Sequence, residues 1–120
     1  MIEFMDESTS KYLGVRVSGK LTDKDYKDVL VPRLEEAFKL QGKLDLLVYM
    51  DDGFEGWDAH AAWDDMSFGL KHAGDFDKLA IVGGAEWIEW CVKACSFLFK
   101  GEVQTYRGDQ LEKAWEWVAG

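Results

Sequence analysis

The residues best suited to chemistry lie in one short acidic segment. Asp51, Asp52, Glu55 and Asp58 are close together in the chain, and His60 follows them. The segment comes directly after a strongly apolar stretch, so it lies at the carboxyl end of an expected strand, where open α/β sheets bind ligands. Several carboxylates there could hold Mg²⁺ or Ca²⁺. The spacing does not match an EF-hand loop, however, and acids are favoured at the start of a helix, so we predict no metal site.

Two further groups of residues give no catalytic pattern. Gly83 and Gly84 precede a helix, where backbone N–H groups could bind an anion, but the glycine-rich phosphate signatures are absent. We therefore interpret this pair as a turn. His60 and His72 have no serine or cysteine at a spacing that suggests a triad. We predict no catalytic residue, no cofactor and no enzymatic activity.

The two cysteines indicate a reducing compartment. Cys91 and Cys95 are four residues apart on an expected helix, where a Cβ separation of about 5–6 Å is too long for an unstrained disulfide. The segment 1–7 has neither the basic region nor the apolar region of a secretory signal. We therefore expect a cytoplasmic protein with reduced thiols.

Length and charge limit the class of protein. The 120 residues are 48% hydrophobic, which indicates one globular domain spanning residues 1–120. The formal charge of -9 argues against nucleic acid as a partner, because phosphates would be repelled. The same charge opposes electrostatic attachment to anionic lipid but not apolar insertion. No apolar run approaches the roughly 18 residues of a membrane span.

One helix is more apolar than a surface helix needs to be. The run Leu79–Val82 predicts a buried strand, the two glycines predict a turn, and the segment 85–100 predicts a helix. At 100° per residue, its apolar side chains cover roughly 220° of the circumference. A single sheet covers less than this arc, so the excess requires a second contact. We expect the side carrying Trp90 and Phe97 to provide it.

A second helix, from about Trp57 to His72, also has apolar residues on two sides. Ala59, Ala62, Trp63, Met66 and Leu70 share one side, which we expect to face the core. Trp57 and Phe68 fall on the opposite side. Combining both helices, we predict five ligand-binding residues: Trp57, Phe68, Trp87, Trp90 and Phe97.

The order of expected elements defines the fold class. Strands alternate with helices after an N-terminal hairpin, in the order β-β-α-β-α-β-α-β-α, which is typical of a largely parallel mixed sheet. Pro32 should interrupt the first helix, Gly42 should end it, and Asp109 should cap the last helix. The expected strands are 2–5, 13–18, 44–50, 76–82 and an edge strand at 102–107, with a loop at 51–56.

Four segments together resemble the SpoIIAA-like family, a branch of the STAS-domain fold. They are Val17–Thr22 leading into a helix, Phe54–Trp57 after the third strand, Phe76–Gly83 before the apolar helix, and Ala114–Trp117 near the C-terminus. The resemblance implies a single α/β domain with a five-stranded mixed sheet and four helices.

The resemblance also bears on function. STAS domains of the anti-sigma-antagonist type bind a partner kinase and are switched by phosphorylation of a serine at the start of the helix after the third strand. Here the segment 51–59 contains no Ser or Thr, and Ser67 lies well inside the helix, so no such serine can be assigned. The SpoIIAA-like branch is similar to lipid-carrying domains, which implies apolar ligands or membranes.

Two hypotheses follow. The first is a non-catalytic binding domain for a small apolar, lipid-like ligand or a membrane interface, with the aromatic residues as its contact. The second is a STAS-type regulatory module that binds a protein partner or forms a homodimer without a phosphorylation switch.

Overall fold

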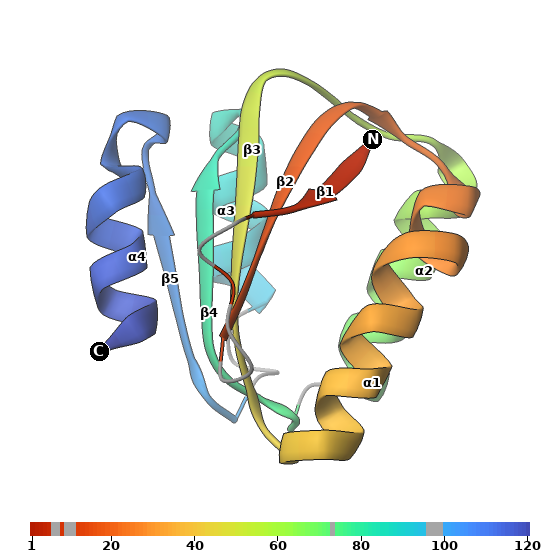
Figure 1. Ribbon diagram of the computed structural model, residues 1–120. Coiled ribbons are helices and arrows are strands. Elements are labelled where there is room, and N and C mark those ends of the chain that lie inside the picture. Colours follow the sequence, from red (N-terminus) through yellow and green to blue (C-terminus); the bar gives the residue numbers. More distant parts are fainter. Residues whose placement is uncertain (6–7, 9–11, 73, 96–99) are drawn as a thin grey trace.

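A five-stranded sheet forms the centre of the domain, and its strands keep the order of the chain (Figure 1). The computed structural model describes residues 1–5, 8, 12–72, 74–95 and 100–120, with the backbone alone at positions 87 and 95. Strand β1 is antiparallel to β2, and each later strand is parallel to the one before it. The predicted mixed sheet with an N-terminal hairpin is confirmed. The strands are β1 (Ile2–Phe4), β2 (Tyr12–Leu21), β3 (Leu44–Trp57), β4 (Phe76–Gly83) and β5 (Glu102–Tyr106).

The helices follow the predicted breaks. A π-helical segment, η1 (Asp25–Leu30), runs directly into α1 (Val31–Gln41), and Pro32 lies in the first turn of α1, where its missing N–H costs little. Gly42 ends α1 with a φ of 80°, a conformation that favours glycine. The remaining helices are α2 (Ala59–Lys71), α3 (Glu86–Cys95), the short 3₁₀ turn η3 (Gly108–Gln110) and α4 (Leu111–Ala119).

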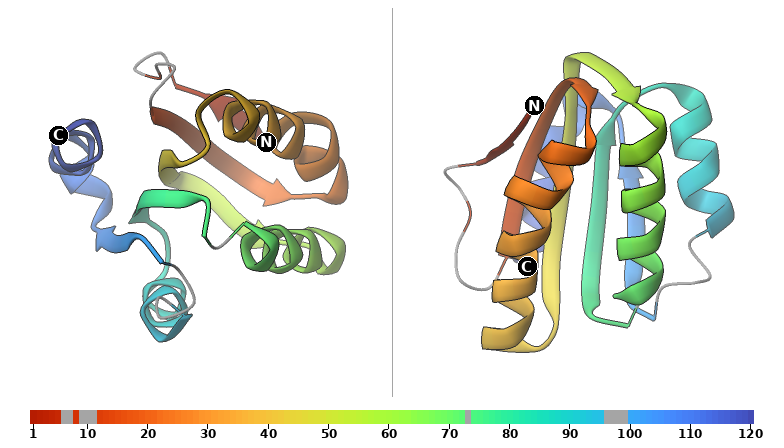
Figure 2. Two further views of the ribbon diagram at one scale, coloured as in Figure 1. Left: turned by 90° about the horizontal axis from the view of Figure 1, so that it is seen from below. Right: turned by 90° about the vertical axis from the view of Figure 1, so that its right-hand side faces the viewer.

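Three α-helices pack on one face of the sheet and one packs on the other (Figure 2). Right-handed crossovers between consecutive parallel strands place α1, α2 and α3 on the same face. Helix α4 follows the last strand and crosses to the opposite face. The larger apolar cluster lies under α1–α3, and the smaller one contains Leu47, Ala80, Val82, Ala114 and Val118 under α4.

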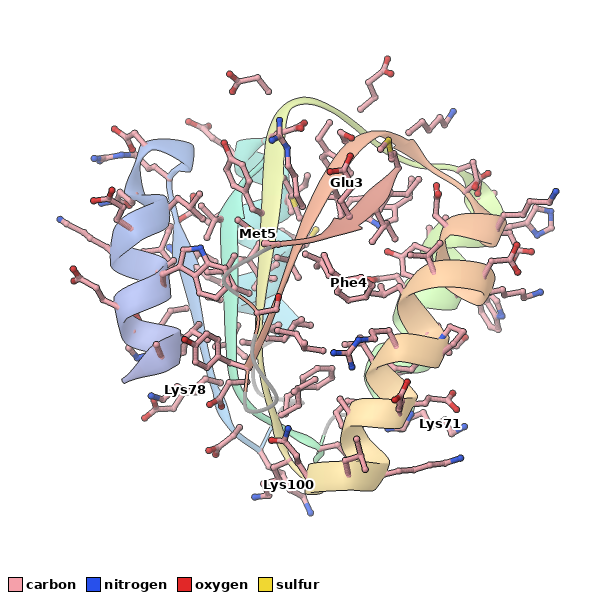
Figure 3. All side chains as sticks on the ribbon, viewed as in Figure 1. Glu3, Phe4, Met5, Lys71, Lys78 and Lys100 are labelled. Atoms are coloured by element: carbon pink, nitrogen blue, oxygen red, sulfur yellow. The ribbon has the colours of Figure 1, made fainter. Side chains whose placement is uncertain are left out.

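Alternation along the strands separates the two clusters. Phe4 packs with the larger cluster and its neighbour Met5 with the smaller one (Figure 3). Lys78 binds the C-terminal end of α4, since its Nζ donates to the carbonyl of Trp117 at 3.0 Å. A cation is favoured at this end of the helix dipole, so the contact helps to hold α4 against the sheet.

Two local predictions were wrong. The segment 51–56 is not a loop, because β3 continues to Trp57 beside the extended β2 and pairs Gly19 with Phe54. The carboxylate of Asp51 stabilises the irregular register there, accepting hydrogen bonds from Arg16 at 2.9 Å and from the Gly53 N–H at 3.0 Å.

The second error concerns the start of the last helix. The residue directly before α4 is Gln110, not Asp109. The Oε1 atom of Gln110 accepts the N–H of Arg107 at 2.9 Å and so closes the 3₁₀ turn η3. The predicted core face of that helix is nevertheless correct, since Ala114 and Val118 are buried and Leu111 and Trp115 pack beside them.

Gly14 is required by the packing of α4. A Cβ atom at this position would overlap the indole of Trp115, which closes the smaller cluster. We predict that Gly14→Ala lowers the free energy of unfolding by about 1–3 kcal/mol, as overpacking of a core does. Urea unfolding would measure the change. Gly69→Ala, near the C-terminal end of α2 with open space around the new methyl group, is the matched control and should leave stability unchanged or raise it by up to about 1 kcal/mol. Equal effects at both positions would contradict the packing argument.

Candidate functional site

The outward face of α2 carries three large apolar side chains. Trp63, Met66 and Leu70 are 69%, 61% and 56% exposed, and their spacing places them on one stripe. Ala59 and Ala62 on the same side are exposed as well. The prediction that this side of the helix faces the core was therefore wrong.

The two residues that were expected outside, Trp57 at the end of β3 and Phe68 of α2, lie on the inner side of the helical layer. Ala61 is fully buried, which lets the helix approach the sheet closely. Phe68 stacks on Phe38 of α1, with ring centroids 6.2 Å apart, and Trp57 meets Phe54 edge-on at 5.1 Å. Both Trp57 and Phe68 pack against the larger core cluster, so their expected position outside the core is also wrong.

A buried tyrosine fixes this rotation of α2. The hydroxyl of Tyr26, a residue only 3% exposed, accepts the Nε1–H of Trp57 at 2.7 Å and donates to Oδ1 of Asp65 at 3.0 Å. Burial is the main cause that raises the pKa of Tyr26, so the hydroxyl keeps its proton for this bond. Asp58 starts the helix by accepting the N–H of Ala61 at 2.7 Å.

The charges of α2 are turned away from its apolar stripe. Asp65 points to Tyr26, and Oδ2 of Asp64 is buried. Along the whole of α2, all of which is described, the outward side therefore presents no carboxylate and is flanked by His60 and Lys71. The apolar stripe is thus free of carboxylates on a chain with a net charge of -9.

Helix α3 adds one exposed aromatic residue. Ile88 is buried, Val92 packs against the core, and Trp90 on the opposite side is 71% exposed. The free thiol of Cys91 is also exposed. Glu89 binds Lys93 at 2.9 Å, and this cation holds the pKa of Glu89 below its usual value.

The five predicted ligand-binding residues do not form one site in the described part of the chain. Trp57 and Phe68 are partly buried against the larger core cluster, and Trp90 is exposed on α3. Trp87 lies in α3, and Phe97 is outside the described residues. The exposed stripe of Trp63, Met66 and Leu70 was not predicted as a site. Its spacing is visible in the sequence, but the prediction placed it in the core.

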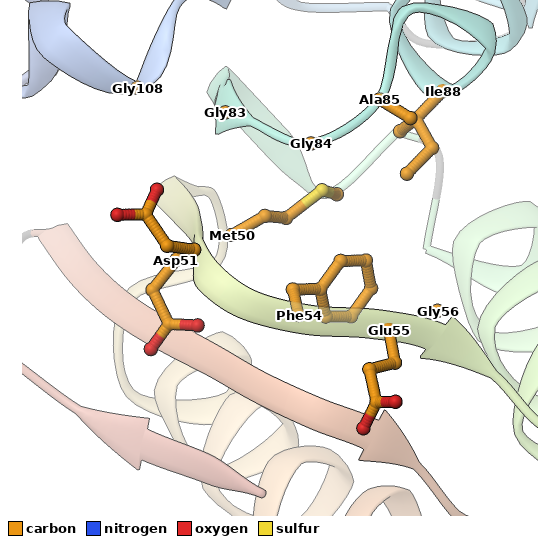
Figure 4. A pocket seen from close by; sticks show the side chains of 11 residues that line it. Met50, Asp51, Phe54, Glu55, Gly56, Gly83, Gly84, Ala85, Ile88 and Gly108 are labelled. Atoms are coloured by element: carbon orange, nitrogen blue, oxygen red, sulfur yellow. The ribbon is translucent and has the colours of Figure 1, made fainter.

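A crevice lies at the carboxyl ends of β3 and β4 (Figure 4). It has a volume of about 380 Å³, and Asp51, Asp52 and Glu55 line it together with Gly83 and Gly84. Both glycines have positive φ, and a Cβ at Gly83 would overlap the carbonyl oxygen of Met50, so the turn requires glycine. Met50, Phe54, Ala85 and Ile88 complete the lining, so the crevice combines three acidic residues with an apolar side.

The acidic residues of this region have structural partners. Asp51 binds Arg16, and Asp58 caps α2. Among the described residues, His, Cys, Asp and Glu side chains do not gather into a group of three or more that could hold a metal ion.

The architecture is that of an α/β domain with three α-helices on one face of a mixed sheet and a fourth on the other. The family model described as SpoIIAA-like matches residues 12–119, and the chain belongs to this family. Among solved structures, it is similar to an uncharacterised protein of the DUF3478 family with a SpoIIAA-like fold from Shewanella loihica. The two share 31% sequence identity with a TM-score of 0.74, over 98% of this chain and 93% of the other. No curated protein matches the chain.

The tyrosine contact is testable through stability. Tyr26→Phe removes the acceptor of the Trp57 indole and the donor to Asp65 in a buried position. We predict a loss of about 1–3 kcal/mol in the free energy of unfolding, measured in urea. Tyr106→Phe is the matched control, because its hydroxyl bonds to Gln104 in an exposed position, and it should change stability by less than about 0.5 kcal/mol. A Tyr26→Phe variant as stable as the control would show that this hydroxyl does not hold α2.

Proposed function

We propose that this domain is a non-catalytic binding module that docks onto a neutral lipid interface through the outward face of α2. One observation carries the proposal: Trp63, Met66 and Leu70 form an exposed apolar stripe on a helix whose carboxylates point away from it. Large exposed apolar patches on a folded domain mark interaction sites. An amphipathic helix of this kind can lie in a membrane interface with its apolar face buried.

A surface contact is favoured over an enclosed ligand. The crevice at the end of the sheet has Asp51, Asp52 and Glu55 in its lining besides apolar residues, and an apolar ligand there would have to desolvate these carboxylates, whereas the large apolar side chains of α2 point outward. The net charge favours neutral over anionic headgroups, because a charge of -9 is repelled by an anionic surface. In the described part of the chain, no helix is long and apolar enough to cross a membrane. Contact would therefore be made from one side of the bilayer.

Trp90 extends the proposed surface to α3. It is as exposed as Trp63 and belongs to a neighbouring helix of the same layer (Figure 2). Tryptophan is suited to the boundary between lipid and water, since its ring is apolar and its N–H is polar. The earlier assignments of Trp87 and Phe97 to ligand binding stay predictions.

Co-sedimentation with neutral phosphatidylcholine vesicles tests the proposal. We predict that Leu70→Gln and Met66→Gln each weaken vesicle binding about tenfold or more. Burying one such side chain is worth about 1.5–3 kcal/mol, and about 1.4 kcal/mol corresponds to a factor of ten. The unfolding free energy should change little, because both side chains are already in water.

Leu40→Gln provides the matched control, since Leu40 is 77% exposed but belongs to α1. It should leave vesicle binding unchanged. An absence of binding by the unaltered protein, or an equal loss in all three variants, would contradict the assignment to α2.

The uncharged stripe also favours a second candidate function, a protein-interaction module of STAS type that can form a homodimer. Two copies could meet through this face without opposing carboxylates, as an isologous contact requires. A phosphorylation switch is not part of this candidate, because helix α2 is capped by Asp58 and the segment 51–59 has no Ser or Thr. Sedimentation velocity distinguishes the two functions. Under this candidate the protein should dimerise in the absence of lipid and Leu70→Gln should restore a monomer, whereas a monomer at high concentration would exclude the homodimer.

A further inference from the structure

The outward surface of α2 carries little positive charge. Lys71, in the last turn, is the one lysine or arginine in this helix, all of which is described. The stripe of Trp63, Met66 and Leu70 is bordered on one side by small residues such as Ala62. Helices that are drawn to a membrane by charge carry several lysines or arginines on their polar face. Contact between α2 and lipid therefore depends on its apolar side chains.

These apolar side chains are few and large. The three residues of the stripe and Trp90 of α3 are each more than half exposed, whereas Ala59 and Ala62 on the same side of α2 add only methyl groups. The large side chains therefore project beyond the surface of the helix. Asp58 caps α2 and the hydroxyl of Tyr26 binds its second turn, so the helix is held in this orientation before any contact is made.

The net charge decides which partner fits this surface. A chain with a charge of -9 is repelled by an anionic bilayer and by a second copy of itself. A neutral bilayer causes no such repulsion, but it gives no electrostatic attraction either. The affinity of α2 for a neutral bilayer is therefore set by the apolar area that the contact buries.

The area that is buried depends on how tightly the lipids are packed. A large side chain enters where the headgroups are spread apart, as they are on strongly curved bilayers or among unsaturated chains. In a flat bilayer of tightly packed chains, the same side chain first has to separate the lipids. A strongly cationic helix can adhere to a flat anionic surface without inserting, whereas α2 has only Lys71 for this purpose.

We propose that this surface selects among neutral membranes by the packing of their lipids, binding curved or loosely packed bilayers in preference to flat, tightly packed ones. This selectivity rests on the proposed function, since it names the kind of membrane that the outward face of α2 binds. Trp63 and Trp90 set the requirement, because their indole rings are the largest of these exposed side chains and need the widest openings between lipids.

Vesicle co-sedimentation with the full chain tests this selectivity. Small sonicated vesicles of dioleoyl phosphatidylcholine are compared, at equal exposed lipid, with large extruded vesicles of the same lipid and with large dipalmitoyl phosphatidylcholine vesicles below their melting temperature. The affinity should be about tenfold higher for the small dioleoyl vesicles than for the large ones, which corresponds to one large side chain left unburied on the flat surface. Binding to the dipalmitoyl vesicles should be weaker still.

The outcomes separate this selectivity from the proposed function. No binding to any of these vesicles would overturn both, whereas equal binding to all of them would overturn the selectivity alone. Stronger binding when phosphatidylglycerol is added to the large vesicles would also overturn the selectivity, because the attraction would then be electrostatic.

Two variants with an added charge locate the contact. Ser67→Lys places a cation on the exposed side of α2, beside the stripe, and Ala119→Lys places the same charge at the exposed end of α4, on the other face of the sheet. With large vesicles that contain phosphatidylglycerol, Ser67→Lys should bind about fivefold more tightly than Ala119→Lys, as one lysine near an anionic surface allows. Equal affinities of the two variants would show that α2 does not face the lipid and would overturn the proposal.

Discussion

The hydroxyl of Tyr26 is the contact on which the arrangement of the helical layer depends. It is bonded on one side to the indole of Trp57, at the end of β3, and on the other to Asp65, in the second turn of α2. These two bonds link η1, the sheet and α2 at one buried point, and an unmade hydrogen bond there would be costly. The rotation of α2 that satisfies them leaves Trp63, Met66 and Leu70 in water. The stripe is therefore exposed because the buried hydroxyl of Tyr26 needs both of its hydrogen-bond partners.

The same constraint explains which parts of the structure could be predicted from the sequence. Uninterrupted apolar runs such as Leu79–Val82 identify buried parallel strands, and Pro32 identifies a break, because both act locally. The rotation of α2 could not be predicted, since apolar residues lie on both of its sides and the decisive partner, Tyr26, is distant in the chain. The continuation of β3 through Asp51 and Gly53 was hidden for a similar reason, because turn-forming residues were held in the sheet by pairing with β2.

The candidate site, too, could be predicted only in part from the sequence. The sequence correctly indicated a surplus of apolar side chains and placed one exposed residue, Trp90, on the right helix. It misplaced Trp57, Phe68 and the stripe of Trp63, Met66 and Leu70, because periodicity identifies a stripe but does not say which stripe meets the sheet. In physical terms, the hydrophobic effect alone does not choose between the two faces of α2. The choice is made by hydrogen bonds and by the need to seat Ala61 and Phe68 against the sheet.

The order of the sheet has a consequence for how the chain reaches this structure. Because each strand pairs with the strand that precedes it, every β–α unit completes contacts with a part of the chain that has already been made. Ribosomal synthesis would therefore add units to a growing sheet in register, without waiting for a distant strand to be inserted between two earlier ones. Only β5 and α4 are synthesised last. They complete the smaller cluster after the strands that support α1, α2 and α3 have been made.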